Sequence, residues 1–188
     1  MSRTVISKPV ATRYQPVLVA LHWLVALLII GLLCVGFFVL ENMSNSDPKK
    51  LDVLVLHMSG GMLVLVLMLV RVIIRRWSAR PAAATTGSSL LDRLASLAHF
   101  GLYAIVFLMI ISGYITGWLI SSAFLPNGPP LPRFAALPSF QVHAVLAVLL
   151  VLLIAAHIAG ALYHQLVLKD GLLHRMWFGK RIITSAEK

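Results

Sequence analysis

The sequence predicts an all-α protein, a transmembrane four-helix bundle with N- and C-termini cytoplasmic. Of its 188 residues 60% are hydrophobic and only 12% are charged, which lies outside the range of soluble domains. Four apolar runs each supply the roughly 20 residues that cross a bilayer; they cover residues 17–39, 53–74, 95–120 and 140–166. The runs lack the alternation of membrane barrel strands, so one helical bundle is the simplest interpretation.

Each run has flanking signals that support its assignment. The run 17–39 follows basic residues as a secretory signal does, but it is too long and no A-x-A-like site follows it, so we expect it in the mature protein. The run 53–74 is followed directly by Arg75 and Arg76. A small, flexible linker precedes 95–120, with a candidate helix start at Ser89. A proline-rich connection precedes 140–166, and we expect it to form a turn-rich cap on the outer face.

Basic residues determine the predicted orientation, because Lys and Arg are retained on the cytoplasmic side. In a four-span topology three fall outside, at Lys49, Lys50 and Arg133. The other thirteen fall on the side of the termini: Arg3, Lys8, Arg13, Arg71, Arg75, Arg76, Arg80, Arg93, Lys169, Arg175, Lys180, Arg181 and Lys188. This asymmetry and anionic lipid headgroups account for the net charge of +10, so no nucleic-acid partner is needed.

The whole chain, 1–188, is predicted to be one membrane domain. Its C-terminal segment 169–183 mixes bulky apolar and basic residues, as an interfacial helix does. The single cysteine, Cys34, cannot form an internal disulfide, and no C-x-x-C-H motif is present for covalent haem attachment.

Four histidines fall at two matched depths of the predicted bundle. His57 and His143 lie near the outer ends of their spans, whereas His22 and His157 each lie seventeen residues from an outer end. His143 and His157 are fourteen residues apart, which returns to within about 40° of the same helix face and separates them by ~21 Å. One helix would therefore present two stacked ligands to the bundle interior.

This arrangement is what two bis-histidine haems require, and it predicts the pairs His57/His143 and His22/His157 as axial ligands. With both axial positions filled, neither iron has an open site for substrate, so electron transfer is the natural task. The alternative is that these histidines tie helices together by hydrogen bonds. That reading is poor for four histidines on three helices, because intramembrane ionisable residues are costly and usually functional.

Further residues near the inner side are secondary candidates. His99 and His164 count as deeper than the inner iron level and are candidates for quinone or propionate contact, or for interfacial polar residues satisfied by water. Arg71 and Arg75 could pair haem propionates or extend to headgroups. Glycines near the histidines, including Gly113 and Gly117, either leave space for porphyrin or form a packing seam.

Two rival classes remain open. A His-lined metal ion transporter would use imidazoles as ligands, but every acidic residue falls in a loop or at a span end, leaving no carboxylate at mid-membrane. A scaffold subunit of a membrane complex would need no cofactor.

With these residues placed, the chain resembles the prokaryotic cytochrome b561 family, which is related to the cytochrome b subunits of hydrogenases and formate dehydrogenases. The resemblance covers nearly the whole chain. It rests on ALHWLVALLIIG, LHMSGGMLVLVLMLVRVIIR, LASLAHFGLYAIVFLMIISGY and VHAVLAVLLVLLIAAHIAGALYHQLVLKDGLLHRM. It implies a four-helix carrier of two haem b groups in the bacterial inner membrane, with His22, His57, His143 and His157 as ligands.

The resemblance also implies a respiratory electron-transport role with ubiquinone as electron partner, and for one subgroup oxidation of superoxide at the outer face. A superoxide:quinone oxidoreductase and a non-catalytic carrier serving an unidentified protein redox partner both remain open. The outer loops carry balanced charge, Lys49, Lys50 and Arg133 against Glu41, Asp47 and Asp52, which weakens the superoxide assignment. The sequence does not determine the direction of electron flow or the oligomeric state.

Overall fold

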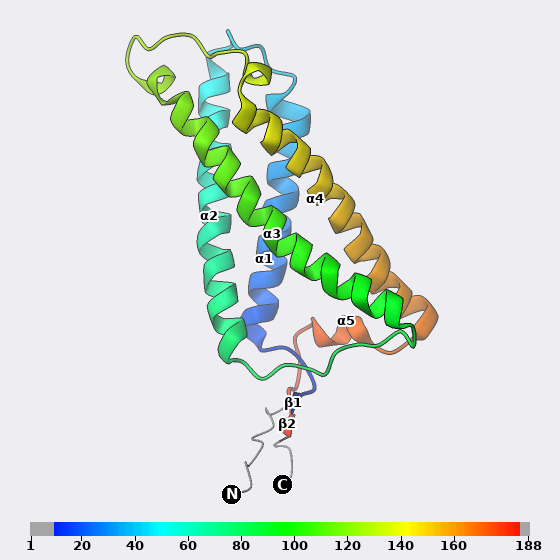
Figure 1. Cartoon of the computed structure of the whole chain (residues 1–188). Coiled ribbons are helices and arrows are strands. Elements are labelled where there is room, and N and C mark those ends of the chain that lie inside the picture. The colour runs from blue at the N-terminus through cyan, green and yellow to red at the C-terminus, as the bar shows by residue number, and fades with distance from the viewer. Residues whose placement is uncertain (1–9, 185–188) are drawn as a thin grey trace, which may run out of the picture.

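The computed structural model describes residues 10–184, and four long helices dominate it (Figure 1). They are α1 (Pro16–Cys34), α2 (Lys49–Trp77), α3 (Ser89–Leu119) and α4 (Pro138–Tyr163). α1 continues as a π-helical turn, η1 (Val35–Leu40), and α4 continues as η4 (His164–Leu168). All four are long and apolar enough to cross a membrane, which confirms the predicted all-α four-helix class.

The helices begin and end close to the apolar runs and extend beyond them into polar residues. α3 begins at Ser89, as the sequence predicted. α2 begins earlier than the apolar run, at Lys49, where the Asp47 carboxylate accepts a hydrogen bond from the Lys49 backbone N–H at 2.9 Å. A carboxylate that accepts from the first N–H groups stabilises a helix start, so the polar residues before the run join the helix.

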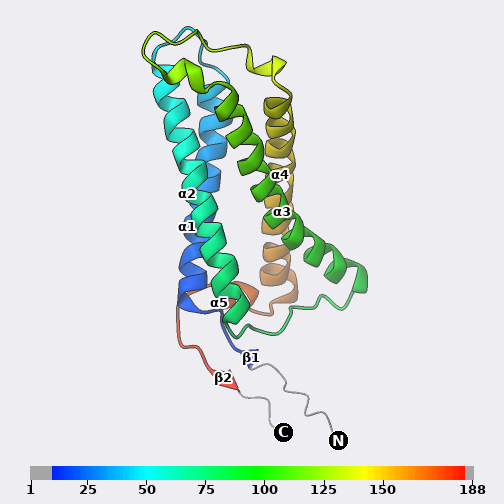
Figure 2. The same cartoon turned by 60° about the vertical axis from the view of Figure 1, so that its left-hand side comes forward.

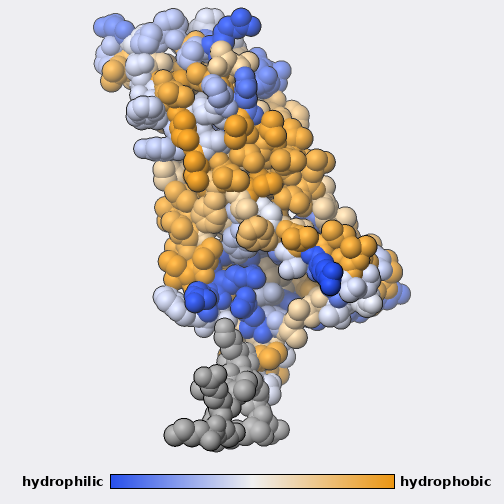
Figure 3. Space-filling model, viewed as in Figure 1, coloured by the Kyte–Doolittle hydropathy of each residue, from blue (hydrophilic) through white to orange (hydrophobic). Residues whose placement is uncertain are grey.

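The interior is a column of apolar side chains contributed by all four helices. Its centre consists of Val25, Val64, Met68, Val106 and Leu150. α3 packs along α4 and α1 along α2, and α3 crosses the bundle obliquely rather than running parallel to its neighbours (Figures 1 and 2). On the face shown in Figure 3, apolar side chains cover most of the middle of the bundle, and polar residues gather toward both ends. That distribution suits a bilayer around the middle of the bundle.

The connections at the end opposite the chain termini fold into the turn-rich cap that the prolines predicted. It contains two short 3₁₀ helices, η2 (Ser121–Phe124) and η3 (Phe134–Ala136). Asn45 Nδ2 donates to the Pro132 carbonyl at 2.7 Å, which joins the two connections. Lys50 is buried, and its Nζ donates to the Met43 carbonyl at 2.7 Å and to Asn45 Oδ1 at 2.8 Å.

The opposite end differs from the expectation of an interfacial helix over 169–183. Only Leu172–Arg175 is helical (α5), and the chain then extends into β2 (Ile183–Thr184), which pairs antiparallel with β1 (Val10–Ala11). Arg13 accounts for the difference, because its Nη1 donates to the carbonyls of His174 at 3.0 Å and Phe178 at 3.3 Å, an alternative to continued helix.

This pairing brings the two ends of the described chain together (Figure 1). Three of the basic residues used for the predicted orientation, Arg3, Lys8 and Lys188, lie outside the described residues.

Candidate functional site

The four predicted ligands meet in two pairs across the bundle, and each pair takes one histidine from α4. The ring centres of His22 and His157 are 6.2 Å apart with an interplanar angle of 70°. Those of His57 and His143 are 6.3 Å apart at 71°. Depth counting along the helices therefore identified the correct neighbours, although His22 and His57 lie on different helices.

The ring separation leaves room for one metal ion between the two imidazoles of each pair. A metal–imidazole bond of about 2 Å, with the nitrogen about 1 Å from its ring centre, places two opposed rings about 6 Å apart. Both pairs have this spacing. Residues 10–184 contain no group of three or more His, Cys, Asp or Glu arranged to hold a metal. Each pair is thus a two-ligand set, which suits an ion whose other ligands come from a macrocycle such as haem.

The His57/His143 pair, predicted to be the outer one, is oriented by neutral groups of α3. His143 Nδ1 lies 3.0 Å from the Met109 carbonyl and 3.1 Å from Ser112 Oγ. Because a carbonyl can only accept, Nδ1 carries the proton and Nε2 carries the lone pair, which is the tautomer that binds metal through Nε2. His57 Nδ1 is buried without a hydrogen-bond partner among the described residues. A buried polar atom without a partner costs free energy. Such atoms are often found at sites that bind a further group.

The glycines divide into two roles. A Cβ on Gly113 would lie 3.0 Å from Cε1 and 3.3 Å from Nδ1 of His143, so this glycine makes room for the ligand ring. A Cβ on Gly117 would collide with the Met58 side chain, and one on Gly60 would lie 2.7 Å from Leu32 Cδ2. Gly60 and Gly117 therefore allow close helix packing, whereas Gly113 serves the site.

A cation lies beside the inner pair. Arg71 Nη1 donates to the Leu18 carbonyl at 2.8 Å, and its Nε donates to the Tyr103 hydroxyl at 3.0 Å. The Leu18 carbonyl is one helical turn below His22, since an α-helix pairs residue i with residue i−4. Arg75 lies farther along α2, with its guanidinium 6.0 Å from the centre of the Tyr103 ring. Arg71 thus carries its charge to the level of the His22/His157 pair.

His99 lies closer to the inner pair than its sequence position predicted. Counting along the helix placed it beyond the inner level, but its ring centre is 5.1 Å from that of His157 at an interplanar angle of 87°. The oblique course of α3 explains this difference, because distance along a tilted helix overstates depth (Figure 2). The 5.1 Å separation is shorter than the about 6 Å needed for an intervening metal. His22, and not His99, is therefore the neighbour of His157 whose distance leaves room for a metal ion between the rings.

His164 forms a separate polar site at the end of α4. It is 7% exposed, and its Nδ1 donates to Asp170 Oδ2 at 2.6 Å. This hydrogen bond holds the pKa of the Asp170 carboxyl below its usual range. In the sequence Asp170 falls in a loop or at a span end, and its pairing with His164 was not predicted. The signal available was Gly171, whose positive φ of 70° helps to turn the chain back toward α4.

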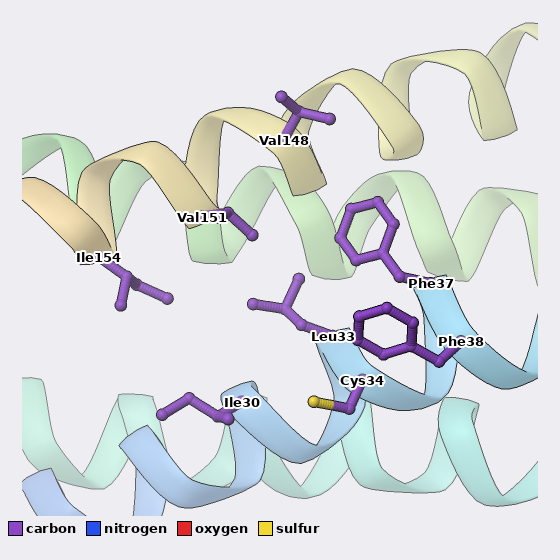
Figure 4. A pocket seen from close by; sticks show the side chains of 8 residues that line it. All are labelled: Ile30, Leu33, Cys34, Phe37, Phe38, Val148, Val151 and Ile154. Carbon is purple, nitrogen blue, oxygen red and sulfur yellow. The ribbon is translucent and has the colours of Figure 1, made fainter.

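An apolar pocket of about 390 Å³ lies between α1 and α4 (Figure 4). Ile30, Leu33 and Phe37 line one side, and Val148, Val151 and Ile154 line the other. Along α4 these valines and Ile154 lie between His143 and His157 in the sequence. The pocket gives the space between the two pairs an apolar lining, as a porphyrin face requires.

Comparison with known proteins identifies the family of the chain. Residues 13–179 match the family described as prokaryotic cytochrome b561. "Cytochrome b561 homolog 2" of Escherichia coli (strain K12) is 29% identical over 175 residues, covering 87% of this chain and 90% of that protein. "Probable superoxide oxidase CybB" of Yersinia pestis is 28% identical over 178 residues, covering 90% of this chain and 98% of that protein. The chain therefore belongs to the prokaryotic cytochrome b561 family, as a multi-pass membrane protein with a role in transmembrane electron transfer through haem b.

Proposed function

We propose that the chain binds two b haems, one between the rings of each histidine pair, and that it carries electrons across the bacterial inner membrane to or from ubiquinone. The observation that supports this most directly is the matched ring separation, 6.2 Å and 6.3 Å, at two levels of one bundle. A bound haem with two imidazole ligands supplies a one-electron carrier without an open iron site. The histidines hold the two carriers at fixed separation.

The helices support this role through their rigidity. The fourteen-residue spacing of His143 and His157 along α4 corresponds to ~21 Å, most of the roughly 30 Å hydrocarbon thickness. The hydrogen bond from His143 to the Met109 carbonyl fixes the orientation of one outer ligand. The apolar pocket between the levels has, among the described residues, no polar side chain in its lining to hold water there.

The termini are placed on the cytoplasmic side in this proposal. Basic residues gather at that end, among them Arg75, Arg80, Arg175 and Arg181. Retention of Lys and Arg in the cytoplasm then assigns the His22/His157 pair to the inner side and the His57/His143 pair to the outer side.

The inner end offers the candidate contacts for quinone and propionates. His99 lies beside His157. Its Nδ1 donates to the Ala95 carbonyl at 2.7 Å, so its Nε2 carries the lone pair and can accept a hydrogen bond from a bound group. Arg71 and Arg75 offer guanidinium donors suited to a haem propionate. His164 is a weaker candidate, because its Nδ1 is already used by Asp170.

The leading specific activity is oxidation of superoxide at the outer face. It is supported by the similarity to the Y. pestis protein named a probable superoxide oxidase. In this reaction each superoxide loses one electron to become O₂, and ubiquinone takes up two electrons and two protons to become ubiquinol. The outer charges do not favour it strongly, because Lys50 is buried and hydrogen-bonded within the cap. A protein redox partner at the outer face is the rival donor.

The first experiment is a dithionite-reduced minus oxidised visible spectrum of the purified protein, with a pyridine haemochrome assay to count haem. Two b haems per chain with sharp low-spin bands are expected. A colourless protein from cells supplied with haem would contradict the proposal and favour the metal transporter class. The second measurement is superoxide consumption coupled to reduction of a soluble ubiquinone analogue. Coupled consumption is expected if superoxide is the electron donor, and none is expected if a protein redox partner is the donor.

A further inference from the structure

We propose that Arg71 raises the reduction potential of the inner haem site above that of the outer one, so that the first electron taken up by the protein resides at the His22/His157 pair. This inference rests on the proposed function, because it assumes that both pairs hold haem. It assigns Arg71 as a positioning and electrostatic residue rather than as a ligand.

The placement of Arg71 carries the argument. Among the charged residues of the four spans it lies farthest from a helix end, and its side chain is half-buried. It bridges three helices, since its own helix is α2 while its donors bind the Leu18 carbonyl of α1 and the Tyr103 hydroxyl of α3. These bonds use two of the five N–H donors of a guanidinium and fix where the charge lies.

A fixed cation at this position favours the reduced state. Reduction takes one electron per iron, from Fe³⁺ to Fe²⁺, and makes or breaks no bond to the protein. The positive charge at the iron falls by one, so its repulsion by Arg71 weakens on reduction. In a bundle interior this interaction is screened much less than in water. Arg71 stays charged throughout the physiological pH range, because a guanidinium does not deprotonate in proteins.

The outer pair has the opposite bias. The neighbours of His143 are neutral, and donation of its Nδ1–H to the Met109 carbonyl makes the ring a more basic ligand, which favours Fe³⁺. Lys50 lies two helical turns before His57, and its ammonium is bonded to Met43 and Asn45 of the cap. The two effects act in the same direction, so the inner site should have the higher potential.

This ordering gives the direction in which electrons move downhill. An electron that enters from a donor at the outer face is drawn to the inner pair, next to the candidate quinone contact His99. Because the membrane potential opposes inward movement of negative charge, a higher inner potential offsets part of that cost.

The test is a potentiometric titration of the purified haem-loaded protein, followed by its visible spectrum. His143→Ala leaves only the inner haem and His22→Ala only the outer one, which assigns each potential. In the two-haem protein Arg71→Gln should lower the inner potential by about 59 mV or more, which for one electron is a tenfold change in the Fe³⁺/Fe²⁺ equilibrium. The outer potential should stay the same. Arg71→Lys should retain most of the wild-type value.

Arg76→Gln is the matched control, because it removes the same charge from an exposed side chain of α2. It should shift the inner potential by less than a third as much. Equal shifts in the two variants, or no shift with Arg71→Gln, would overturn the proposal. If Arg71→Gln loses the inner haem, the test becomes the comparison of the inner potential in His143→Ala with the outer potential in His22→Ala. An inner potential at or below the outer one would overturn the inference. A protein without haem would instead refute the proposed function.

Discussion

The inner and outer histidine pairs have nearly the same geometry and very different surroundings. Ring separations of 6.2 Å and 6.3 Å, and interplanar angles of 70° and 71°, make them equivalent as ligand sets. The outer pair is surrounded by backbone and hydroxyl dipoles of α3 and by Gly113. The inner pair has Arg71 nearby and His99 against one ring. The comparison teaches that the spacing of residues along the helices sets how the histidines pair, whereas neighbouring helices set the electrostatics of each level.

The largest expected effect is loss of one haem per chain. His143→Ala should remove only the outer haem and His157→Ala only the inner one, because each pair draws a different histidine from α4. The measurement is the haem count by pyridine haemochrome together with the α bands. His174→Ala, an exposed substitution outside the spans, is the control and should retain both haems. Loss of both haems from either substitution, in protein that still assembles in the membrane, would break the two-site description.

A smaller effect is expected from filling the space beside His143. Gly113→Val should displace the ring, since even a Cβ would lie 3.0 Å from its Cε1. Overpacking of this kind costs about 1–3 kcal/mol, which corresponds to roughly 5-fold to 150-fold in outer haem affinity. Haem titration of the apoprotein measures it. Gly31→Val is the matched control, because a Cβ there would meet nothing within 4 Å. An equal loss of the inner haem would show that Gly113 acts on the bundle rather than on the outer site.

A still smaller effect is expected from the hydroxyl beside the same ring. Ser112→Ala removes the Oγ that lies 3.1 Å from His143 Nδ1 but leaves the Met109 carbonyl in place. The change should cost about 1 kcal/mol or less in outer haem affinity, with both haems retained. The same apoprotein titration, compared with wild type, is the measurement. A stronger effect than that of Gly113→Val would mean that Ser112, and not Met109, orients the ligand.

The smallest effect concerns the polar pair His164–Asp170, which lies beyond both histidine pairs. Asp170→Asn should leave the haem count unchanged and lower the thermal midpoint at neutral pH. The pKa of Asp170 is depressed in the folded protein by the hydrogen bond from His164. Its contribution is therefore present above the unfolded pKa, about 3.9, and is lost as pH falls through the folded pKa. Thermal unfolding from pH 3 to pH 7 should show the two proteins converging at the acid end. A difference in thermal midpoint that stays constant from pH 3 to pH 7 would show that the ionised Asp170 carboxylate is not the source of the stabilisation.

The sequence predicted both the helices and which histidines face each other, because these depend on local patterns. Apolar length fixed the four spans to within a few residues, since hydrocarbon thickness limits helix length. The fourteen-residue spacing on α4 predicted that His143 and His157 would serve two levels, and the structure pairs both rings accordingly. Their role as haem ligands remains a prediction that the haem count tests.

Only the tertiary structure decided what surrounds each pair. The tilt of α3 brought His99 against His157, although counting along the helix had placed it deeper. Arg71 reached across to Leu18 and Tyr103, and Arg13 held the C-terminal segment out of a long helix. The physical reason is the same in each case. Hydrophobicity and helical period act within one segment, whereas tilt and side-chain hydrogen bonds arise only when separate segments pack together.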